Sequence, residues 1–391
     1  ISRHVLVEDL HGIVEADLSD RSTLAVGVSY QKNTPEGVMW GALPLFYSDG
    51  SATDYDRSTS TSADWSYWNT ENTQAFVELS HEFGNDWRLV AAYNYEDVVQ
   101  DSQLFYVYGT PDRTTGLGLY AYPSDYSGSY RSDFYDVYVT GAFTLGGRSH
   151  ELVFGGNWAD AANAEISWYG NDVGTPIADL GSWTGEYPKP SFDSYSSYSD
   201  FEYRRGSAYA TVRWNLRDNI KLITGANYAR VSTDGVSYGE AKDTETSKTT
   251  PFAGLTVDLD ENYSAYASYG EIFSEQGQMD IDNQLVGPIT GDSLEAGVKG
   301  EWLDGRLNAS AALFKMNQNN LAEYAGYNPN TGLSYYRGED ASSEGIELTV
   351  AGALNDIWQV FGGYTHLNIT GDGEQDARTY VPRDMLRIST T

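Results

Sequence analysis

The side chains that could carry out chemistry are few and lie far apart in the sequence. The five histidines are His4, His11, His81, His150 and His366. No two of them have the His-x-x-x-His spacing that brings two ligands to one metal ion. No phosphate-binding loop or nucleophile elbow is visible, and no base stands beside a nucleophile as catalysis requires. We therefore expect no catalytic residue and no metal site, and a protein that is not an enzyme.

Acidic residues outnumber basic ones in this chain, by 56 Asp and Glu to 24 Lys and Arg, for a formal charge of −32. This charge repels phosphate groups, so we expect no nucleic-acid partner. A solvated acidic surface explains the composition, and binding of a cationic ligand or a divalent ion is the alternative. The absence of cysteine excludes disulfides and thiolate metal sites. Aromatic residues make up 14% of the chain, far more than in disordered acidic chains, so the chain folds.

The segment from Thr250 to Gln276 alternates between apolar and polar residues with a period of two. As two strands, it places small apolar residues on one face, and these are Ala253, Leu255, Val257, Leu259, Ala265 and Ala267. Tyr263 and Tyr269 bound that face. The opposite face carries Asp258, Ser264, Ser268 and Gly270. The same period recurs in about fifteen segments, and no segment has the pattern of a helix of three turns. The sequence therefore predicts an all-β protein.

The connections between these segments are of two kinds, which alternate along the chain. Short polar turns occur at 19–22, 84–86, 146–148, 217–219, 260–262, 304–306 and 355–356. Long loops are expected between them, near 33–71, 103–130, 163–200, 234–248, 274–291, 323–338 and 371–382. If each strand pairs with the next, the short turns gather at one end of the sheet and the long loops at the other. This asymmetry is typical of an outer-membrane barrel, which has short periplasmic turns and long extracellular loops.

Strands can cross a membrane without any long apolar segment. No stretch of this chain approaches the roughly 20 apolar residues of a transmembrane helix, but a transmembrane strand needs only about 9–11 residues, with every second one apolar. We therefore predict an antiparallel transmembrane β-barrel whose apolar face contacts outer-membrane lipid. Tyr263 and Tyr269 then belong to the aromatic girdles at the two interfaces, and the serines face a wet lumen. A soluble antiparallel sheet with one buried face is the alternative, because it shows the same alternation.

Five stretches of the sequence resemble a known family. They are GVMWGALPL (37–45), RSTSTSADWSYWNTENTQAFVELSHEFGNDWRLVAAYNY (57–95), TPFAGLTVDLDENYSAYASYGEIFSEQ (250–276), LEAGVKGEWLDGRLNASAALFKMNQNNLAEYAG (294–326) and EDASSEGIELTVAGAL (339–354). In this order they resemble TonB-dependent ferric-siderophore receptors, most of all the hydroxamate, ferric-coprogen and ferripyoverdine branch. The resemblance covers essentially the whole chain. It implies a plugged outer-membrane barrel of about 22 strands, which imports a ferric siderophore with energy from TonB.

The sequence departs from the full pattern of that family at both ends. It shows no signal peptide, TonB box or N-terminal plug, and it stops at PRDMLRISTT (382–391), where the family continues through further strands. We therefore expect residues 1–391 to be one partial barrel domain, with about 15 of the family's strands and without the plug and the terminal strands. The TonB complex would engage the absent plug and TonB box.

Aromatic residues near the predicted loops are the candidate ligand-binding residues. They are Trp40, Trp65 and Trp68 in the first long loop, and Tyr106 and Tyr108 in LFYVYG (104–109), which leads into the second. A ferric siderophore already wraps its iron in its own oxygens, so the receptor needs aromatic faces and hydrogen-bond donors, not iron ligands. Tryptophans in matching stretches of ferripyoverdine-type receptors line the siderophore pocket, which supports Trp40 and Trp68 directly and Trp65 less so. The two tyrosines follow from position alone, and packing within a girdle or between loops is the alternative for all five.

The resemblance thus implies an outer-membrane receptor that imports ferric siderophores with energy from TonB. Its expected partners are a ferric siderophore, the TonB complex and outer-membrane lipid, and it is expected to act as a monomer. No cofactor is expected, because the iron is carried within the siderophore. Two alternatives remain. A passive porin would have a constriction of paired charges and no aromatic vestibule, and a soluble all-β adhesin would have polar sheet faces.

Overall fold

The chain folds into one antiparallel sheet. The computed structural model describes residues 5–391, so His4 lies outside the described residues. The strands are β1 (Val5–Ser19), β2 (Ser22–Pro35), β3 (Tyr67–Glu82), β4 (Arg88–Gly109), β5 (Leu119–Leu145), β6 (Arg148–Tyr169), β7 (Tyr195–Arg217), β8 (Ile220–Ser237), β9 (Glu240–Ala241), β10 (Thr244–Asp258), β11 (Tyr263–Ser274), β12 (Ile289–Trp302), β13 (Leu307–Tyr327), β14 (Ser334–Asn355), β15 (Trp358–Gly371) and β16 (Asp384–Thr390). Two short 3-10 segments, η1 (Leu180–Ser182) and η2 (Asp372–Glu374), lie in the loops. Within residues 5–391, no helix is long and apolar enough to cross a membrane.

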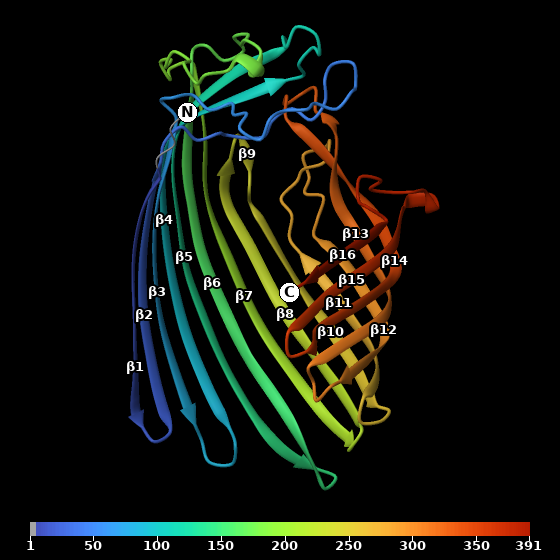
Figure 1. The fold of residues 1–391 in the computed structure, drawn as a ribbon. Helices are drawn as coiled ribbons and strands as arrows, with labels where there is room; N and C mark the ends of the chain where they lie inside the picture. Colours follow the sequence, from blue (N-terminus) through green and yellow to red (C-terminus); the bar gives the residue numbers. More distant parts are fainter. Residues whose placement is uncertain (1–4) are drawn as a thin grey trace.

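Each strand pairs with its neighbour in the sequence. The order runs from β1 to β8 and from β10 to β16, and the two-residue β9 pairs with β8 beside this path. Figure 1 shows the sheet curled like the wall of a barrel, with β1–β3 on one side and β13–β16 on the other. The predicted all-β fold and its antiparallel meander are confirmed.

The seven predicted short turns all join consecutive strands at one end of the sheet, at the bottom of Figure 1. The tightest are the two-residue connections of β1 to β2, β5 to β6, β7 to β8 and β14 to β15. In the connection of β5 to β6, Gly146 and Gly147 have φ angles of 61° and 77°. A two-residue turn that matches the twist of its strands needs positive φ at both positions, which is why two glycines stand there.

The long loops lie at the opposite end, but four of them are shorter than the sequence pattern indicates. The expected loop 103–130 is irregular only at 110–118, because β4 continues to Gly109 and β5 begins at Leu119. The expected loops 163–200 and 323–338 shrink to 170–194 and 328–333, and most of 234–248 lies in β8, β9 and β10. The connections 36–66, 275–288 and 372–383 are long loops as predicted.

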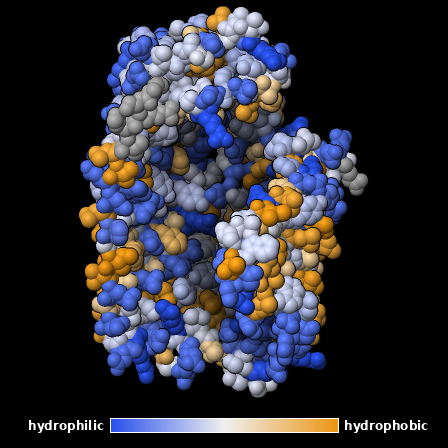
Figure 2. Space-filling view, viewed as in Figure 1, coloured by the Kyte–Doolittle hydropathy of each residue, from blue (hydrophilic) through white to orange (hydrophobic). Residues whose placement is uncertain are grey.

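The pairing register places the apolar residues of all strands on one face of the sheet. Directly opposed residues of an antiparallel pair point to the same side. A row of opposed residues on β11, β12 and β13 links Val257 of β10 to Leu348 of β14. By the same register, Glu295, Lys299 and Glu347 lie on the other face. Figure 2 shows apolar side chains along the flanks of the molecule and mostly polar ones in the hollow between them, so the apolar face is the outer one.

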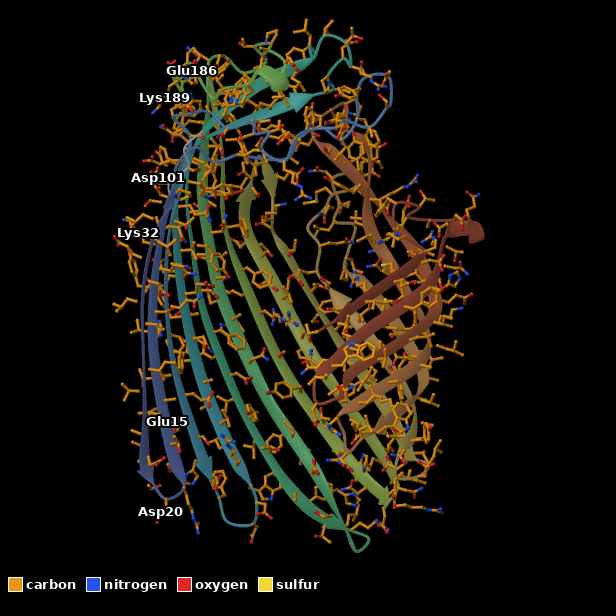
Figure 3. The ribbon with its side chains drawn as sticks, in the orientation of Figure 1. Glu15, Asp20, Lys32, Asp101, Glu186 and Lys189 are labelled. Carbon is orange, nitrogen blue, oxygen red and sulfur yellow. The ribbon has the colours of Figure 1, made fainter. Side chains whose placement is uncertain are left out.

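The outer face is layered from the short turns to the loops. Aromatic residues lie beside the turns, and they are Trp87, Phe143, Trp214, Tyr263, Trp302 and Trp358. Ion pairs lie on the loop side of the apolar band, such as Arg204 with Asp160 at 3.3 Å. On β7, the eleven residues from Arg204 to Trp214 span ~25 Å at the usual rise per residue and barrel tilt. The apolar band is therefore as tall as the lipid-facing band of a transmembrane barrel. In Figure 3, Asp20 marks the turn end, and Lys32, which forms an ion pair with Glu71, lies nearer the loop end.

Candidate ligand-binding site

The hairpin of β4 and β5 extends beyond the other strands and turns over the loop end of the sheet (Figure 1). Loops 36–66 and 170–194 pack on one face of this extension and form a small core, which consists of Ala63, Phe105, Val107, Leu119, Ala121, Ile177 and Leu180. The opposite face of the extension carries tyrosines. Because both faces are apolar or aromatic, the sequence loses its alternation here, and its pattern indicates a loop where the structure has strands.

Seven aromatic rings cover the inner face of the extension and of the strands beside it. We call them the aromatic cluster, and they are Trp40, Tyr106, Tyr108, Tyr120, Tyr122, Tyr169 and Tyr195. Tyr122 lies at its centre, with ring centroids 6.3 Å from Trp40 and 5.2 Å from Tyr169. β5 runs from the barrel wall into the extension without a register shift against β4. The aromatic cluster therefore continues the inner face of the wall at the loop end.

Trp40 reaches the aromatic cluster because loop 36–66 runs close along β4. Its backbone forms an isolated parallel bridge with Tyr106, and the two ring centroids are 5.7 Å apart. The next residue, Gly41, has φ of 83°, and a Cβ there would lie 2.3 Å from the Tyr106 ring. Only glycine allows this approach. The structure thus brings together three predicted site residues, Trp40, Tyr106 and Tyr108.

Trp68 lies on the same inner face, but within β3 and not in the loop. It stands opposite Ser102 of β4, and its indole Nε1 donates a hydrogen bond to Oε1 of Gln100 at 3.2 Å. Ser102 in turn stands opposite Tyr126 of β5, whereas Tyr169 of the aromatic cluster stands opposite Ser124, two residues nearer the loop end of β5. Trp68 therefore lies one row of inward-facing residues farther from the loop end than Tyr169.

Trp65 does not join the aromatic cluster. Its ring packs edge-on against Phe105 and Phe192, at centroid distances of 6.0 and 5.9 Å. Its indole Nε1 donates to the carbonyl oxygen of Tyr187 at 2.9 Å. These contacts lie on the other face of the extension, so Trp65 ties loop 36–66 to loop 170–194. Of the five predicted site residues, it is the one that the structure places away from the others.

Replacing Trp65 by alanine should loosen the loops. Truncation of a partly buried aromatic side chain should cost roughly 2 kcal/mol, which opens the local structure about thirtyfold more often. Hydrogen exchange of backbone amides in 36–66 and 170–194 measures this. Trp168→Ala removes a ring that is 44% exposed on the outer face and serves as the control. Equal protection of both loops in the two variants would contradict the packing role of Trp65.

Four members of the aromatic cluster were not predicted from the sequence, namely Tyr120, Tyr122, Tyr169 and Tyr195. The first two alternate in LYAYP (119–123), directly opposite Tyr106 and Tyr108, and this repeated Tyr-x-Tyr is a signal that could have identified them. Burial, and then a hydrogen bond with Tyr195, raise the pKa of Tyr122. The two hydroxyl oxygens are 3.1 Å apart. The Tyr122 phenol therefore stays protonated at neutral pH and keeps its hydrogen-bond donor.

The four histidines within residues 5–391 do not assemble into a site. His11, His81, His150 and His366 lie on β1, β3, β6 and β15. Within residues 5–391, no group of three His, Cys, Asp or Glu side chains is placed to hold a metal ion. What the inner face offers is aromatic surface with phenol and indole donors, which suits a bulky organic ligand.

The short turns at one end, the long loops at the other and the apolar band around the outer face define the chain as an outer-membrane β-barrel. The family model described as "TonB dependent receptor-like, beta-barrel" matches residues 14–391, and the chain belongs to this family.

Similar proteins are receptors for pyoverdines. The ferripyoverdine receptor of Pseudomonas aeruginosa is 33% identical over 397 residues, which cover 97% of this chain and 47% of the receptor. The ferric-pyoverdine BN7/BN8 receptor of Pseudomonas putida is 34% identical over 398 residues, which cover 98% of this chain and 48% of that receptor. The crystal structure of the P. aeruginosa receptor bound to ferripyoverdine matches with a TM-score of 0.88 at 31% identity, over 99% of this chain and 52% of that one. The chain thus spans about half the length of the relatives it matches.

Proposed function

We propose that this barrel is part of an outer-membrane receptor that imports ferric siderophores with energy supplied by TonB. The observation that carries the proposal is the aromatic cluster on the inner face at the loop end. A ligand that arrives from outside meets this surface first. The relatives named above are receptors for ferric pyoverdines, which makes a ferric siderophore the ligand class that best fits this surface.

The proposal assigns each predicted site residue a role. Trp40, Tyr106 and Tyr108 contact the chelate with their rings, and Trp68 contacts the part of the ligand that reaches deeper along the wall. Trp65 supports the loops from behind and does not touch the ligand. The iron stays wrapped in siderophore oxygens, so the protein supplies no iron ligand, carries no cofactor and catalyses no reaction.

The remaining partners follow from the same proposal. Outer-membrane lipid surrounds the apolar band, and the TonB complex drives transport. Residues 1–391 belong to a single barrel domain, since one continuous sheet runs through residues 5–391. The receptor acts as a monomer and binds no nucleic acid, in keeping with its formal charge of −32.

Uptake of radioactive iron as ferripyoverdine tests the function. The complete protein is expressed in cells that lack their own ferric-siderophore receptors, and uptake is measured with and without TonB. We expect uptake that saturates with ligand and stops when TonB is deleted. Uptake that rises linearly with concentration and ignores TonB would show a passive porin instead.

A further inference from the structure

A carboxylate lies on the inner face of the wall, below the aromatic cluster. Glu165, Ser167 and Tyr169 alternate along β6, and register places all three on the inner face. Tyr169 follows Glu165 by four positions, which is about 13 Å along a strand. Glu165 is half-buried, and it lies at the level of Gln100, the hydrogen-bond partner of Trp68.

The side chain of Glu165 is held by a neighbouring phenol. The hydroxyl of Tyr126 on β5 donates a hydrogen bond to its Oε2 at 2.7 Å. Tyr126 reaches it by lying over Gly128, which is the residue directly opposite Glu165. A Cβ on Gly128 would lie 2.5 Å from the Tyr126 hydroxyl oxygen. Glycine within a strand often marks such a close approach, and here it lets the phenol orient the carboxylate.

The negative charge of Glu165 has no cationic partner within residues 5–391. A second phenol, Tyr238, lies beside it, and burial and then the hydrogen bond to Glu165 raise the pKa of Tyr238 to about 12. Both phenols are therefore neutral donors at physiological pH. On the outer face the situation differs, since Glu202 and Asp160 pair with Arg204. A half-buried carboxylate that only neutral groups contact lacks an opposite charge, and an incoming cation would supply one.

We propose that Glu165 binds a cationic arm of the ferric siderophore, an ammonium or guanidinium group, while the aromatic cluster and Trp68 hold the chelate. The inference rests on the proposed function and adds the class of siderophore, one that carries a positive charge outside its iron-binding groups. The distance from Glu165 to Tyr169 leaves room for an alkyl or peptide arm that extends from the chelate down the wall.

The contribution of this contact should be measurable as a difference in affinity between chelates with and without the cation. A charge-assisted hydrogen bond in a partly desolvated site is worth about tenfold in affinity or more. A chelate with the cation should therefore bind roughly tenfold more tightly than the same chelate without it.

Two ferric chelates that differ only in this charge provide the test. Ferrioxamine B carries a free amine that is an ammonium ion at neutral pH, and its N-acetyl derivative is the same chelate without the charge. Dissociation constants are measured by tryptophan fluorescence quenching on the complete receptor in detergent. We expect about tenfold preference for ferrioxamine B in the unmodified protein. The preference should vanish in Glu165→Gln and persist in Glu202→Gln, which removes the same charge from the outer face.

The outcomes separate this inference from the function on which it rests. A purely structural Glu165 would weaken both chelates alike and leave their ratio unchanged in Glu165→Gln, and that result would overturn the inference. Equal binding of both chelates by the unmodified protein would overturn it too, as would binding of ferripyoverdine with rejection of ferrioxamine B. If neither ferrioxamine B nor ferripyoverdine binds at all, the proposed function itself fails.

Discussion

Replacing Trp40 by alanine is expected to weaken ferric-siderophore binding about thirtyfold. A ring desolvated against a bulky ligand contributes buried area and roughly 0.5–1.5 kcal/mol of specific aromatic contact. Truncation of such an anchor typically costs about 2 kcal/mol or more, which corresponds to that loss in affinity. Trp40 is half-buried against Tyr106 and Tyr122, so its position is fixed before the ligand arrives. Fluorescence quenching by ferripyoverdine on the complete receptor gives the dissociation constant.

Trp68→Ala and Trp65→Ala test whether the loss of affinity is confined to tryptophans on the inner face. Trp68 shares the inner face with Trp40, so its loss should also weaken binding, whereas Trp65 packs behind the extension and should mainly affect loop stability. Assembly in the membrane should be normal in all three variants, because none of the three residues lies on the lipid-facing surface. If Trp40→Ala and Trp68→Ala both bind ferripyoverdine with unchanged affinity, these rings only pack the loops, and the ligand binds elsewhere.

The strands and short turns could be predicted from sequence because their signals are local. Period-two alternation arises wherever one face of a strand meets lipid and the other meets water. Gly146-Gly147 indicates a tight turn, because both positions need a positive φ angle, which glycine adopts readily. The extension of β4 and β5 escaped prediction because loops cover its outer side. Phe105 and Val107 are buried there while Tyr106 and Tyr108 line the other face, so no polar residue breaks the run.

The candidate site was only partly accessible from sequence, for a different reason. Whether two rings meet depends on pairings between distant segments, as between Tyr122 and Tyr195, which are 73 positions apart. The stretch DWSYW illustrates the limit. Trp65 and Trp68 are three residues apart, yet strand β3 begins between them and sends their rings to opposite sides. Composition identifies aromatic segments, but only the register and loop packing decide which ring faces the lumen.

Arginine at Leu348 is expected to destabilise the folded barrel in a bilayer by about 2–4 kcal/mol, the cost of a cation near the middle of a lipid-facing strand. Leu348 is 44% exposed on the outer face. It lies opposite Ala311 and Tyr364, within the apolar band. Lipid cannot solvate a guanidinium group at that depth, and the side chain can reach neither the turns nor the ion-pair layer without distortion. The free energy of unfolding is measured by denaturant titration of the complete barrel in lipid vesicles.

The neighbouring residue provides a matched control, since Thr349 points to the inner face. Its hydroxyl shares a hydrogen bond with Ser310 at 2.6 Å, and Glu347 lies on the same face two residues away. Thr349→Arg loses that single bond, worth about 1 kcal/mol, and places its charge among polar side chains beside a carboxylate. It should therefore cost much less than Leu348→Arg, although both variants add the same charge to the same strand. Equal costs would mean that the two faces of β14 meet the same solvent, and the assignment of the apolar face to lipid would be wrong.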